Sequence, residues 1–380
     1  MVERLRGDSM RNGCRHPSHA GRGHGHHVFL AGLLVAAVLL IGGVPVGRAA
    51  PAGRVVVYSA APLDFTETLK RDFEAQNPGV TVEILAGLGT EAMITRLEAE
   101  RASPRADVMH SGAVFEYMIA TQKGLLAPTR PREIAGVHPA NLFLGGSKVP
   151  LFDPEGRWYV WGFSLGVIGY NRDRLAALRV PPPKTWSDLT NPIYKGHVVF
   201  NMPQLSSSAF NTIVAHHQIM GPRGVWAYWD RLHENITFYS RSTSALYTLV
   251  ARGEVPISFG TARTYYVNQA GGLPVEIVYP VDGAWVFATA MGMVKGAPNP
   301  ELAKTFMKFV LSAPGQVNSA NNFQNPIRAG IRATAHNLDL SIDALVRQVP
   351  KIVVVDADLA EKLRAEVMRR FDAYTAGRAR

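Results

Sequence analysis

One short motif in the sequence is typical of a catalytic nucleophile. Residues Gly162-Phe163-Ser164-Leu165-Gly166 match G-x-S-x-G, the nucleophile elbow of serine hydrolases. In such an elbow a strand ends in a sharp turn that carries the serine, and a helix follows. Here Val167-Ile168-Gly169-Tyr170 is β-branched and aromatic, which predicts that the strand continues beyond Ser164. We therefore keep a serine hydrolase at Ser164 only as a remote alternative, and we expect a protein that is not an enzyme.

Hydroxyl side chains occur at the expected starts of several helices. Thr90 follows Gly89, Ser206-Ser207-Ser208 precedes an apolar run with helical spacing, and Ser242-Thr243 follows Arg241. The first turn of a helix has free amide groups and the positive end of the helix dipole, so it favours anions. The alternative role of each hydroxyl is to cap its helix without touching any ligand.

The elements that would position these residues alternate between strand and helix. Residues 55–59, 80–85 and 107–110 are short strand-like runs, and a helical pattern follows each of them. This order predicts an α/β fold with a mainly parallel sheet. Farther along, helical patterns cover 206–221 and 221–236, a strand is expected over 286–295, and the tail from about 339 is expected to be helical.

The N-terminal residues have the order of a secretory signal. Basic residues come first, the apolar run 28–46 follows, and Ala49, Ala50 and Ala52 provide small residues for cleavage. We expect residues 1–52 to be a signal peptide; the alternative is an uncleaved membrane anchor. Cys14, the one cysteine, lies before the apolar run, so the mature chain contains no cysteine and no disulfide. An exported chain of this kind is expected in the periplasm.

The charge distribution argues against a nucleic-acid partner. The chain has a formal net charge of +10, but no run of Lys and Arg with interleaved aromatic residues. At 380 residues the chain suits two domains better than one.

Several segments together resemble the periplasmic extracellular solute-binding proteins of ABC importers. They are VVVYSA (55–60), ADVMHSG (106–112), KGLLAP (123–128), PKTWSDLTNPIYKGHVVF (183–200) and GMVKGAPNPELAKTFMKFVLSAPGQ (292–316). The Trp-x-Asp-Leu-x-x-Pro-x-x-Lys-Gly pattern within them is fairly specific. The resemblance is greatest to the members that bind ferric ion, phosphonates or sugar phosphates.

The resemblance implies a type II fold of two α/β lobes, joined by two hinge strands, with the ligand cleft between the lobes. Lobe 1 would comprise 53–163 and 283–330, and lobe 2 would comprise 164–282 and 331–380 with the C-terminal helices. The chain would cross between the lobes at 163–167 and at 280–285. Hinge closure around a ligand would then create the form that the permease recognises.

In that topology the hydroxyl-bearing helix starts face the cleft. Arg241 and Arg263 would add positive charge and a bidentate fork for a carboxylate or phosphate. Asp282 would accept from a sugar hydroxyl or an amine, or else would be a turn residue before glycine. Trp285 would form an apolar wall. The expected ligand-binding residues are Ser59, Thr90, Ser111, Ser207, Ser208, Arg241, Ser242, Thr243, Arg263, Tyr265, Tyr266, Asp282 and Trp285.

Tyr265 and Tyr266 raise an alternative, because ferric-binding relatives use an adjacent tyrosine pair as phenolate ligands to Fe3+. The rest of that pattern is missing. This chain has Ala60-Ala61-Pro62 where those relatives carry a histidine, and Ser111-Gly112 where they carry a glutamate. Tyr265 and Tyr266 would otherwise contact an organic ligand or pack in the interior. Ferric iron as the transported ligand therefore stays the alternative, with no resident metal or cofactor expected.

The function predicted from the sequence is that of a substrate-binding component of an ABC transporter. It would capture a small oxyanion-bearing solute, such as a phosphonate or a sugar phosphate, in the periplasm. It would deliver this solute to an inner-membrane permease, and we expect it to act as a monomer.

Overall fold

The computed structural model describes residues 53–130, 134, 141–144 and 147–380 of the chain. The expected signal peptide, residues 1–52, lies outside the described residues. Among the described residues, no helix combines the length and the apolar character needed to cross a membrane.

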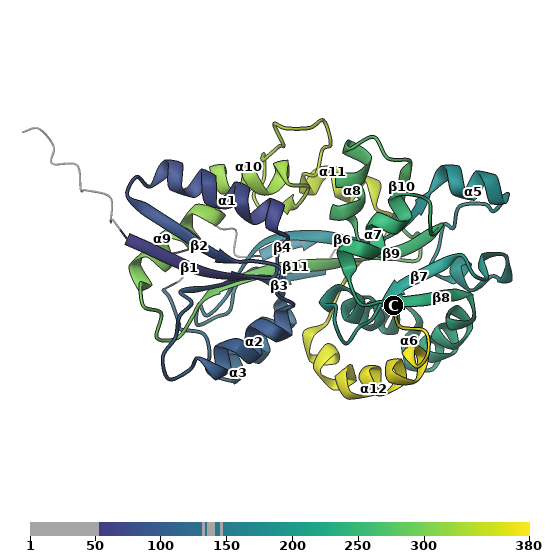
Figure 1. The fold of residues 1–380 in the computed structure, drawn as a ribbon, viewed down its shortest axis with the longest axis horizontal. Coiled ribbons are helices and arrows are strands. Elements are labelled where there is room, and N and C mark those ends of the chain that lie inside the picture. The colour runs from purple at the N-terminus through teal and green to yellow at the C-terminus, as the bar shows by residue number, and fades with distance from the viewer. Residues whose placement is uncertain (1–52, 131–133, 135–140, 145–146) are drawn as a thin grey trace, which may run out of the picture. The chain divides into compact units, whose positions relative to one another are not determined.

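The first part of the chain alternates between strands and helices, as expected. Figure 1 shows α1 on one face of the neighbouring strands β1, β2 and β3, and α2 and α3 on the other face. The elements are β1 (Gly53–Ser59), α1 (Leu63–Gln76), β2 (Val80–Leu85), α2 (Thr90–Ala99), β3 (Val108–Ala113), α3 (Val114–Gln122), β4 (Asn141–Leu144), β5 (Ser147–Pro150), β6 (Tyr159–Asn171) and α5 (Arg172–Leu178).

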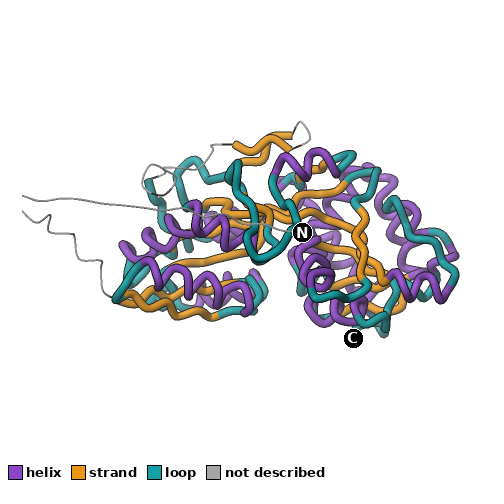
Figure 2. The backbone as a smooth tube through the Cα atoms, turned by 90° about the horizontal axis from the view of Figure 1, so that it is seen from above, coloured by secondary structure: helices purple, strands orange, loops and turns teal. Residues whose placement is uncertain are grey.

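The second part contains the remaining strands and the longer helices. Helices lie on both sides of the strands, as the view from above shows (Figure 2). The elements are the 3-10 helices η1 (Ser187–Thr190) and η2 (Pro192–Tyr194), then β7 (Val198–Asn201), α6 (Ser207–Asn235), β8 (Ile236–Ser240), α7 (Thr243–Ala251), β9 (Ile257–Thr261), α8 (Ala262–Ala270), β10 (Val275–Val278), β11 (Ala284–Met293), α9 (Pro300–Leu311), α10 (Ala313–Asn321), β12 (Asn325–Pro326), α11 (Ile342–Gln348), β13 (Ile352–Val354) and α12 (Ala357–Thr375).

The strands form a continuous hydrogen-bonded path in the order β2-β1-β3-β11-β6-β9-β7-β8. Strand β1 is parallel to both β2 and β3, and β7 is parallel to both β8 and β9. Strands β11 and β6 lie between these two parallel groups and are antiparallel to their neighbours. The α/β prediction is therefore confirmed, with two parallel groups joined through β6 and β11.

Strand β6 changes partner halfway along its length. Up to Leu165 it pairs with β11, and from Gly166 onward it pairs with β9. Ser164 therefore lies inside a continuous strand, as its sequence context predicts, and not on a strand-to-helix turn. A nucleophile elbow needs that turn to expose its serine, so the G-x-S-x-G match here has a different structural basis.

The glycine that ends this motif is required by packing. A Cβ atom built on Gly166 would lie 1.9 Å from Nε1 of Trp285 and 2.2 Å from two other atoms of the indole ring. Trp285 is the second residue of β11 and is fully buried. The two segments at which the sequence analysis expects crossovers therefore pack directly on each other.

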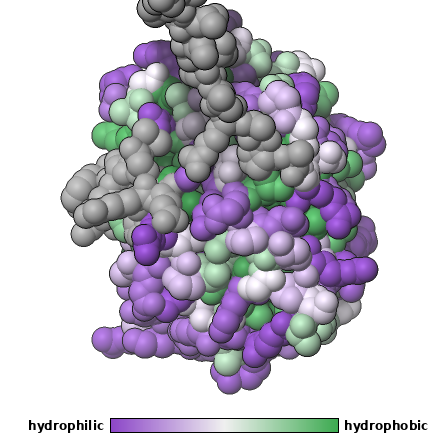
Figure 3. Space-filling model, turned by 90° about the vertical axis from the view of Figure 1, so that its left-hand side faces the viewer, coloured by the Kyte–Doolittle hydropathy of each residue, from purple (hydrophilic) through white to green (hydrophobic). Residues whose placement is uncertain are grey.

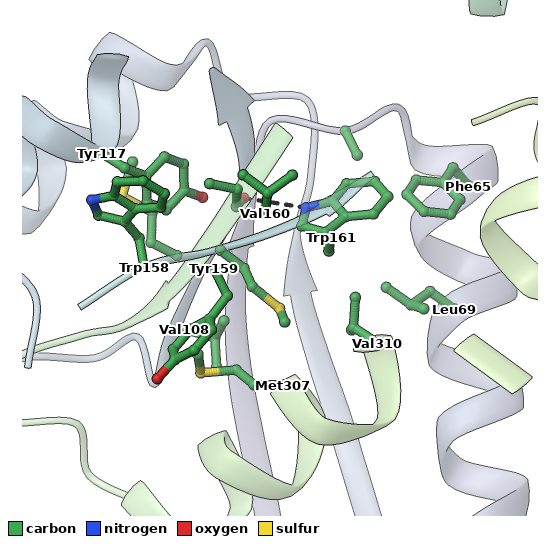
Figure 4. Packing of buried hydrophobic residues seen from close by; sticks show 14 of the residues in the cluster. Phe65, Leu69, Val108, Tyr117, Trp158, Tyr159, Val160, Trp161, Met307 and Val310 are labelled. Carbon is green, nitrogen blue, oxygen red and sulfur yellow. Dashed lines mark hydrogen bonds between the residues drawn. The ribbon is translucent and has the colours of Figure 1, made fainter. Parts of the chain in front are cut away.

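Buried apolar residues form two main clusters, one around each parallel strand group. The first includes the ring of Trp161 in β6, which stacks on Phe65 of α1 with ring centroids 5.4 Å apart. Figure 4 shows the Trp161 indole directed toward Phe65, while its Nε1 donates to the carbonyl oxygen of Ala290 at 3.2 Å. The second cluster contains Trp186 and Trp229, with residues of α12. Apolar burial of this kind is the main stabilising contribution to the fold.

The sequence patterns locate most elements but miss some boundaries. The two helices expected over 206–221 and 221–236 run together as α6, with a kink at Gly221, where φ is 73°. The strand expected over 286–295 begins two residues earlier, at Ala284.

On the side of the molecule shown in Figure 3, hydrophobic residues are interspersed among hydrophilic ones. Such mixing is ordinary for a protein surface.

Candidate ligand-binding cleft

A cleft of about 630 Å³ lies between the two parallel strand groups. The first turns or caps of α1, α2, α3, α6, α7 and α8 line it, together with residues of β6 and β11. Its volume falls within the ~300–1,000 Å³ range of small-molecule sites. Because helix starts carry unpaired amide groups and a positive dipole end, their convergence makes the cleft suitable for an anion.

Hydroxyl groups link the helix starts within this cleft. The Oγ1 atom of Thr90, at the start of α2, lies 3.3 Å from Oγ of Ser207 at the start of α6. Thr243, at the start of α7, donates to Oγ of Ser206 at 3.3 Å, and Ser206 in turn lies 3.2 Å from Ser208. These contacts bring the start of α6 against the starts of both α2 and α7, and we call these five hydroxyls the hydroxyl cluster.

Local sequence explains why these helices begin here. Ser206 accepts a hydrogen bond from the backbone N–H of Ala209, and Ser242 accepts one from the N–H of Ala245, so each serine caps its own helix. Gly112, at the end of β3, has φ of 106° and lies against Thr90: an added Cβ would come 2.6 Å from Oγ1. Glycine is needed there for both the backbone conformation and the close approach.

Arginine side chains enter the cleft from several elements, with different partners. Arg241 is exposed and has no hydrogen bond or ion pair from its guanidinium to the described residues. Arg263 is mostly buried: it donates to the carbonyl oxygen of Asn322 at 2.8 Å and pairs with Asp64 at 3.3 Å. Arg364 of α12 forms an ion pair with Glu91 of α2. Arg241 is therefore the cation most available to a bound anion.

Glu116, in the first turn of α3, is a buried acid in the same cleft. Glu116 is 3% exposed, and its Oε2 atom has no hydrogen-bond partner among the described residues. Burial raises the pKa of Glu116 to about 7, whereas a hydrogen bond from Ser207 and the charge of Arg364 lower it. A carboxyl group in this position is costly to keep ionised unless a positive group compensates it.

Side chains of the central strands form another part of the cleft wall. Ser164 lines it with a buried Oγ that has no partner among the described residues. Ser164 lies directly opposite Phe287 of β11, and Phe287 lines the cleft as well. Thr289, two residues farther along β11, donates to the carbonyl oxygen of Gly162 at 2.9 Å. Polar groups left without protein partners in a cleft are typical of positions that a ligand or water completes.

Most of the expected binding residues line this cleft. They come from both strand groups, although they are widely separated in sequence. Those that line it are Thr90, Ser111, Ser207, Ser208, Arg241, Ser242, Thr243 and Arg263. Those that do not are Ser59, Tyr265, Tyr266, Asp282 and Trp285, and each of these has a structural role instead.

The tyrosine pair points into the protein interior. Tyr265 is fully buried, its hydroxyl lies 2.6 Å from Oγ of Ser258, and its ring occupies the space above Gly169. The hydroxyl of Tyr266 contacts that of Tyr279. Burial raises the pKa of both tyrosines, which opposes phenolate formation. The expectation that the pair faces the cleft therefore does not hold, because α8 directs Arg263 to the cleft and residues 265 and 266 to the core.

Asp282 and Trp285 are structural for a related reason. The carboxylate of Asp282 accepts hydrogen bonds from the backbone N–H of Trp186, at 3.0 and 3.1 Å, so it caps the start of η1. Trp285 is buried against Gly166 rather than lining the cleft. The turn role that the Asp-Gly sequence left open for Asp282 is the one that its contacts support.

Ser59 is also turned away from the cleft. Its Oγ lies 2.9 Å from Nδ1 of His110 and accepts a hydrogen bond from the N–H of Ala61 at 3.1 Å. These contacts hold the turn between β1 and α1, and the neighbouring residues 60–62 line the cleft in its place.

Sequence reasoning missed Glu116 and Tyr247 as cleft residues and considered Ser164 only as a nucleophile. Glu116 had one available signal: it is a single acid between aromatic residues in the first turn after a buried strand. Such a residue is rarely buried without a partner. Tyr247 had no comparable signal, because its hydroxyl reaches the cleft edge only through packing, where it accepts from the N–H of Thr261 at 3.2 Å.

A second cavity, of about 930 Å³, is larger but less suited to a polar solute. It lies between α3, α6 and the segment after β13, and Phe115, Phe152, Trp158 and Val286 supply apolar walls. It contains none of the hydroxyl-bearing starts of α2, α6 and α7. We therefore assign the candidate site to the smaller cleft.

A family model and several known proteins match most of this chain. Residues 103–349 match the family model of the bacterial extracellular solute-binding protein. An uncharacterized protein of Haemophilus influenzae is 31% identical over 288 residues, which cover 75% of this chain and 80% of that protein. A putative 2-aminoethylphosphonate-binding periplasmic protein of Salmonella typhimurium is 26% identical over 274 residues, covering 70% and 75% of the two chains.

A solved structure is similar over nearly its whole length. It is the periplasmic binding protein AfuA from Actinobacillus pleuropneumoniae with exogenous fructose-6-phosphate bound. The TM-score is 0.73 at 26% identity, and the match covers 86% of this chain and 99% of AfuA. With its two strand groups, central crossing strands and intervening cleft, this chain belongs to the family of bacterial extracellular solute-binding proteins.

Proposed function

We propose that this protein captures a small oxyanion-bearing solute, a phosphonate or a phosphorylated sugar, in the cleft between its two strand groups. The observation that carries the proposal is the convergence of the hydroxyl-bearing starts of α2, α6 and α7 on one cleft beside Arg241. Free amides, hydroxyls and one available guanidinium are the groups that bind phosphate and phosphonate oxygens.

The ligands of two relatives support the same class. One relative is described as binding 2-aminoethylphosphonate, and AfuA was solved with fructose-6-phosphate. Both ligands carry a phosphorus oxyanion on a small organic body.

We also propose that the protein works in the periplasm and delivers its solute to an ABC permease of the inner membrane. The apolar run 28–46 and the small residues after it support export by a signal peptide. The partner change of β6 at Leu165 and Gly166 supports a hinge at 163–167, with 53–163 and 283–330 in one lobe. Contacts such as Thr90 with Ser207 would then join the lobes on closure.

A ligand screen tests the proposal. The mature protein is heated with phosphonates, sugar phosphates, polyamines, uncharged sugars or ferric citrate, and its melting temperature is compared with that of the free protein. A ligand at ~100 times its Kd adds about 2.7 kcal/mol of stability. With an unfolding entropy of about 2.1 cal/mol/K per residue, this raises Tm by about 4 °C. A rise only with polyamines, uncharged sugars or ferric citrate would exclude the oxyanion proposal.

A further inference from the structure

Glu116 is an acid inside a cleft whose other features favour anions. It lies in α3 and lines the cleft, where it interacts with Ser207 of the hydroxyl cluster and with the charges of Glu91 and Arg364. Its Oε2 atom is buried and lacks a partner among the described residues, although the residue lines the cleft. An oxyanion alone gives the ionised form of this carboxyl group no favourable interaction, because the two negative charges would repel.

Among the described residues, no cation forms an ion pair with Glu116. The cation that faces it, Arg364 of α12, already pairs with Glu91 of α2. From α6, Ser207 supplies a neutral hydroxyl only. A buried carboxylate with no paired cation is strongly unfavourable, so its compensating charge must come from outside the chain or the group must stay protonated.

We propose that Glu116 receives a protonated amine of the bound solute, which makes the ligand class amino-substituted phosphonates or amino-sugar phosphates. This inference rests on the proposed function, because the same solute places its oxyanion on the helix starts and Arg241. The charges that are not already paired within the cleft then match a zwitterion: hydroxyls, amides and the guanidinium of Arg241 for the anion, and the carboxylate of Glu116 for the cation.

The pairing has a consequence for pH dependence. In the free protein, burial raises the pKa of Glu116 to about 7, so binding an amine below that pH requires the carboxyl group to lose its proton. Affinity for an amine-bearing ligand is therefore expected to fall as pH is lowered from 8 to 6, by up to about tenfold per pH unit below the pKa. Glu116→Gln removes the ionisable group and with it this part of the pH profile.

Two matched ligand pairs test the inference by isothermal titration calorimetry. They are 2-aminoethylphosphonate with ethylphosphonate, and glucosamine 6-phosphate with glucose 6-phosphate, each titrated into wild type and into Glu116→Gln at pH 6 and pH 8. Glu67→Gln, the same change at an exposed acid of α1, is the control. A melting curve of each variant establishes that it is folded.

The expected result is that wild type and Glu67→Gln bind the amine-bearing member of at least one pair about 10- to 100-fold more tightly than its partner at pH 8. This is the gain in affinity that a hydrogen bond between charged groups provides. In Glu116→Gln that preference and its pH dependence should disappear, while the partner without an amine binds at least as tightly as to wild type, because its oxyanion no longer faces a carboxylate. Equal affinity of wild type for both members of each pair, or an amine preference that survives in Glu116→Gln, overturns the inference alone. If no phosphonate or sugar phosphate binds at all, the proposed function fails as well.

Discussion

Gly166→Ala should destabilise the protein through a single contact. The new methyl group would lie 1.9–2.2 Å from three atoms of the Trp285 indole, whereas carbon atoms in contact normally lie ~3.5–4.0 Å apart. Trp285 is fully buried and packs edge-on against Phe287 with ring centroids 6.0 Å apart. The indole or the β6 backbone must therefore move by more than an ordinary thermal displacement.

The expected cost follows from two opposing effects. Overpacking of a close-packed core costs about 1–3 kcal/mol, and this overlap is severe enough to place it at the upper end. Replacing glycine by alanine also restricts the unfolded chain, which stabilises by about 0.4–1 kcal/mol. The net loss is about 2 kcal/mol. For a unit of residues 50–380, with an unfolding entropy of about 2.1 cal/mol/K per residue, Tm should fall by about 3 °C.

A double-mutant cycle measured by urea unfolding isolates the contact. Trp285→Leu opens space above Gly166, so Gly166→Ala should cost about 2 kcal/mol less in that background than in wild type. Gly224→Ala is the matched control, because Gly224 lies in α6 with only Met220 Cβ near the added atom, at 3.5 Å. That change should stabilise the helix by up to ~1 kcal/mol. If the two changes at 166 and 285 add to within ~0.5 kcal/mol, the contact does not exist as described.

Four further predictions follow from other sites. Asp282→Ala should remove the carboxylate that accepts from the N–H of Trp186 and lower the unfolding free energy by about 1 kcal/mol, while calorimetry finds ligand affinity unchanged. A large affinity loss would return Asp282 to the binding site. Tyr265→Phe should lower the unfolding free energy by about 1 kcal/mol, because it removes the hydrogen bond to Ser258. Ferric citrate should produce no tyrosinate charge-transfer band in wild type, and a band that Tyr265→Phe abolishes would favour iron as the ligand. Burial lowers the pKa of His216 in the folded protein to about 3, so the stability that its neutral form contributes is present above the unfolded pKa near 6.5 and is lost as pH falls toward 3. His216→Phe should reduce the pH dependence of the unfolding free energy in this range by about one proton, or 1.36 kcal/mol per pH unit. An unchanged pH dependence would refute a buried, neutral His216. Because burial raises the pKa of Glu116 in the folded protein to about 7, the stability that its protonated form contributes is lost as pH rises toward 7. The Tm of Glu116→Gln should therefore exceed that of wild type by more at pH 8 than at pH 5, and an equal Tm difference at the two pH values would contradict the burial of Glu116.

The sequence predicted the fold because its patterns are local. Alternating β-rich runs and helical periodicity located β1 to α3, and the β-branched residues after Ser164 predicted the uninterrupted strand β6. Hydroxyl residues at helix starts were recognisable in the same way, since capping involves residues three positions apart. Ser206 and Ser242 are the caps of α6 and α7, and Ser207 and Thr243 follow them directly; Thr90 follows Gly89, which caps α2 without a side-chain hydrogen bond.

The orientation of individual side chains could not be predicted from these patterns. Tyr265 and Arg263 are two residues apart on α8, yet one fills the space above Gly169 and the other enters the cleft. Which face of a short helix meets the core depends on the helix rotation that packing selects. The adjacent tyrosines therefore suggested a metal site on the basis of residue type alone.

The sequence by itself determined the class of the protein: an α/β chain with hydroxyl-rich helix starts, in an order that resembles solute-binding proteins. Only the tertiary structure decided which of those residues share a cleft, that Trp285 covers Gly166, and that the Oε2 atom of Glu116 is buried without a hydrogen-bond partner among the described residues. The physical reason is the separation along the chain of the residues that each interaction joins. Capping and periodicity act within a few residues, whereas charge compensation and steric fit in the cleft join residues more than a hundred positions apart, such as Thr90 and Ser207.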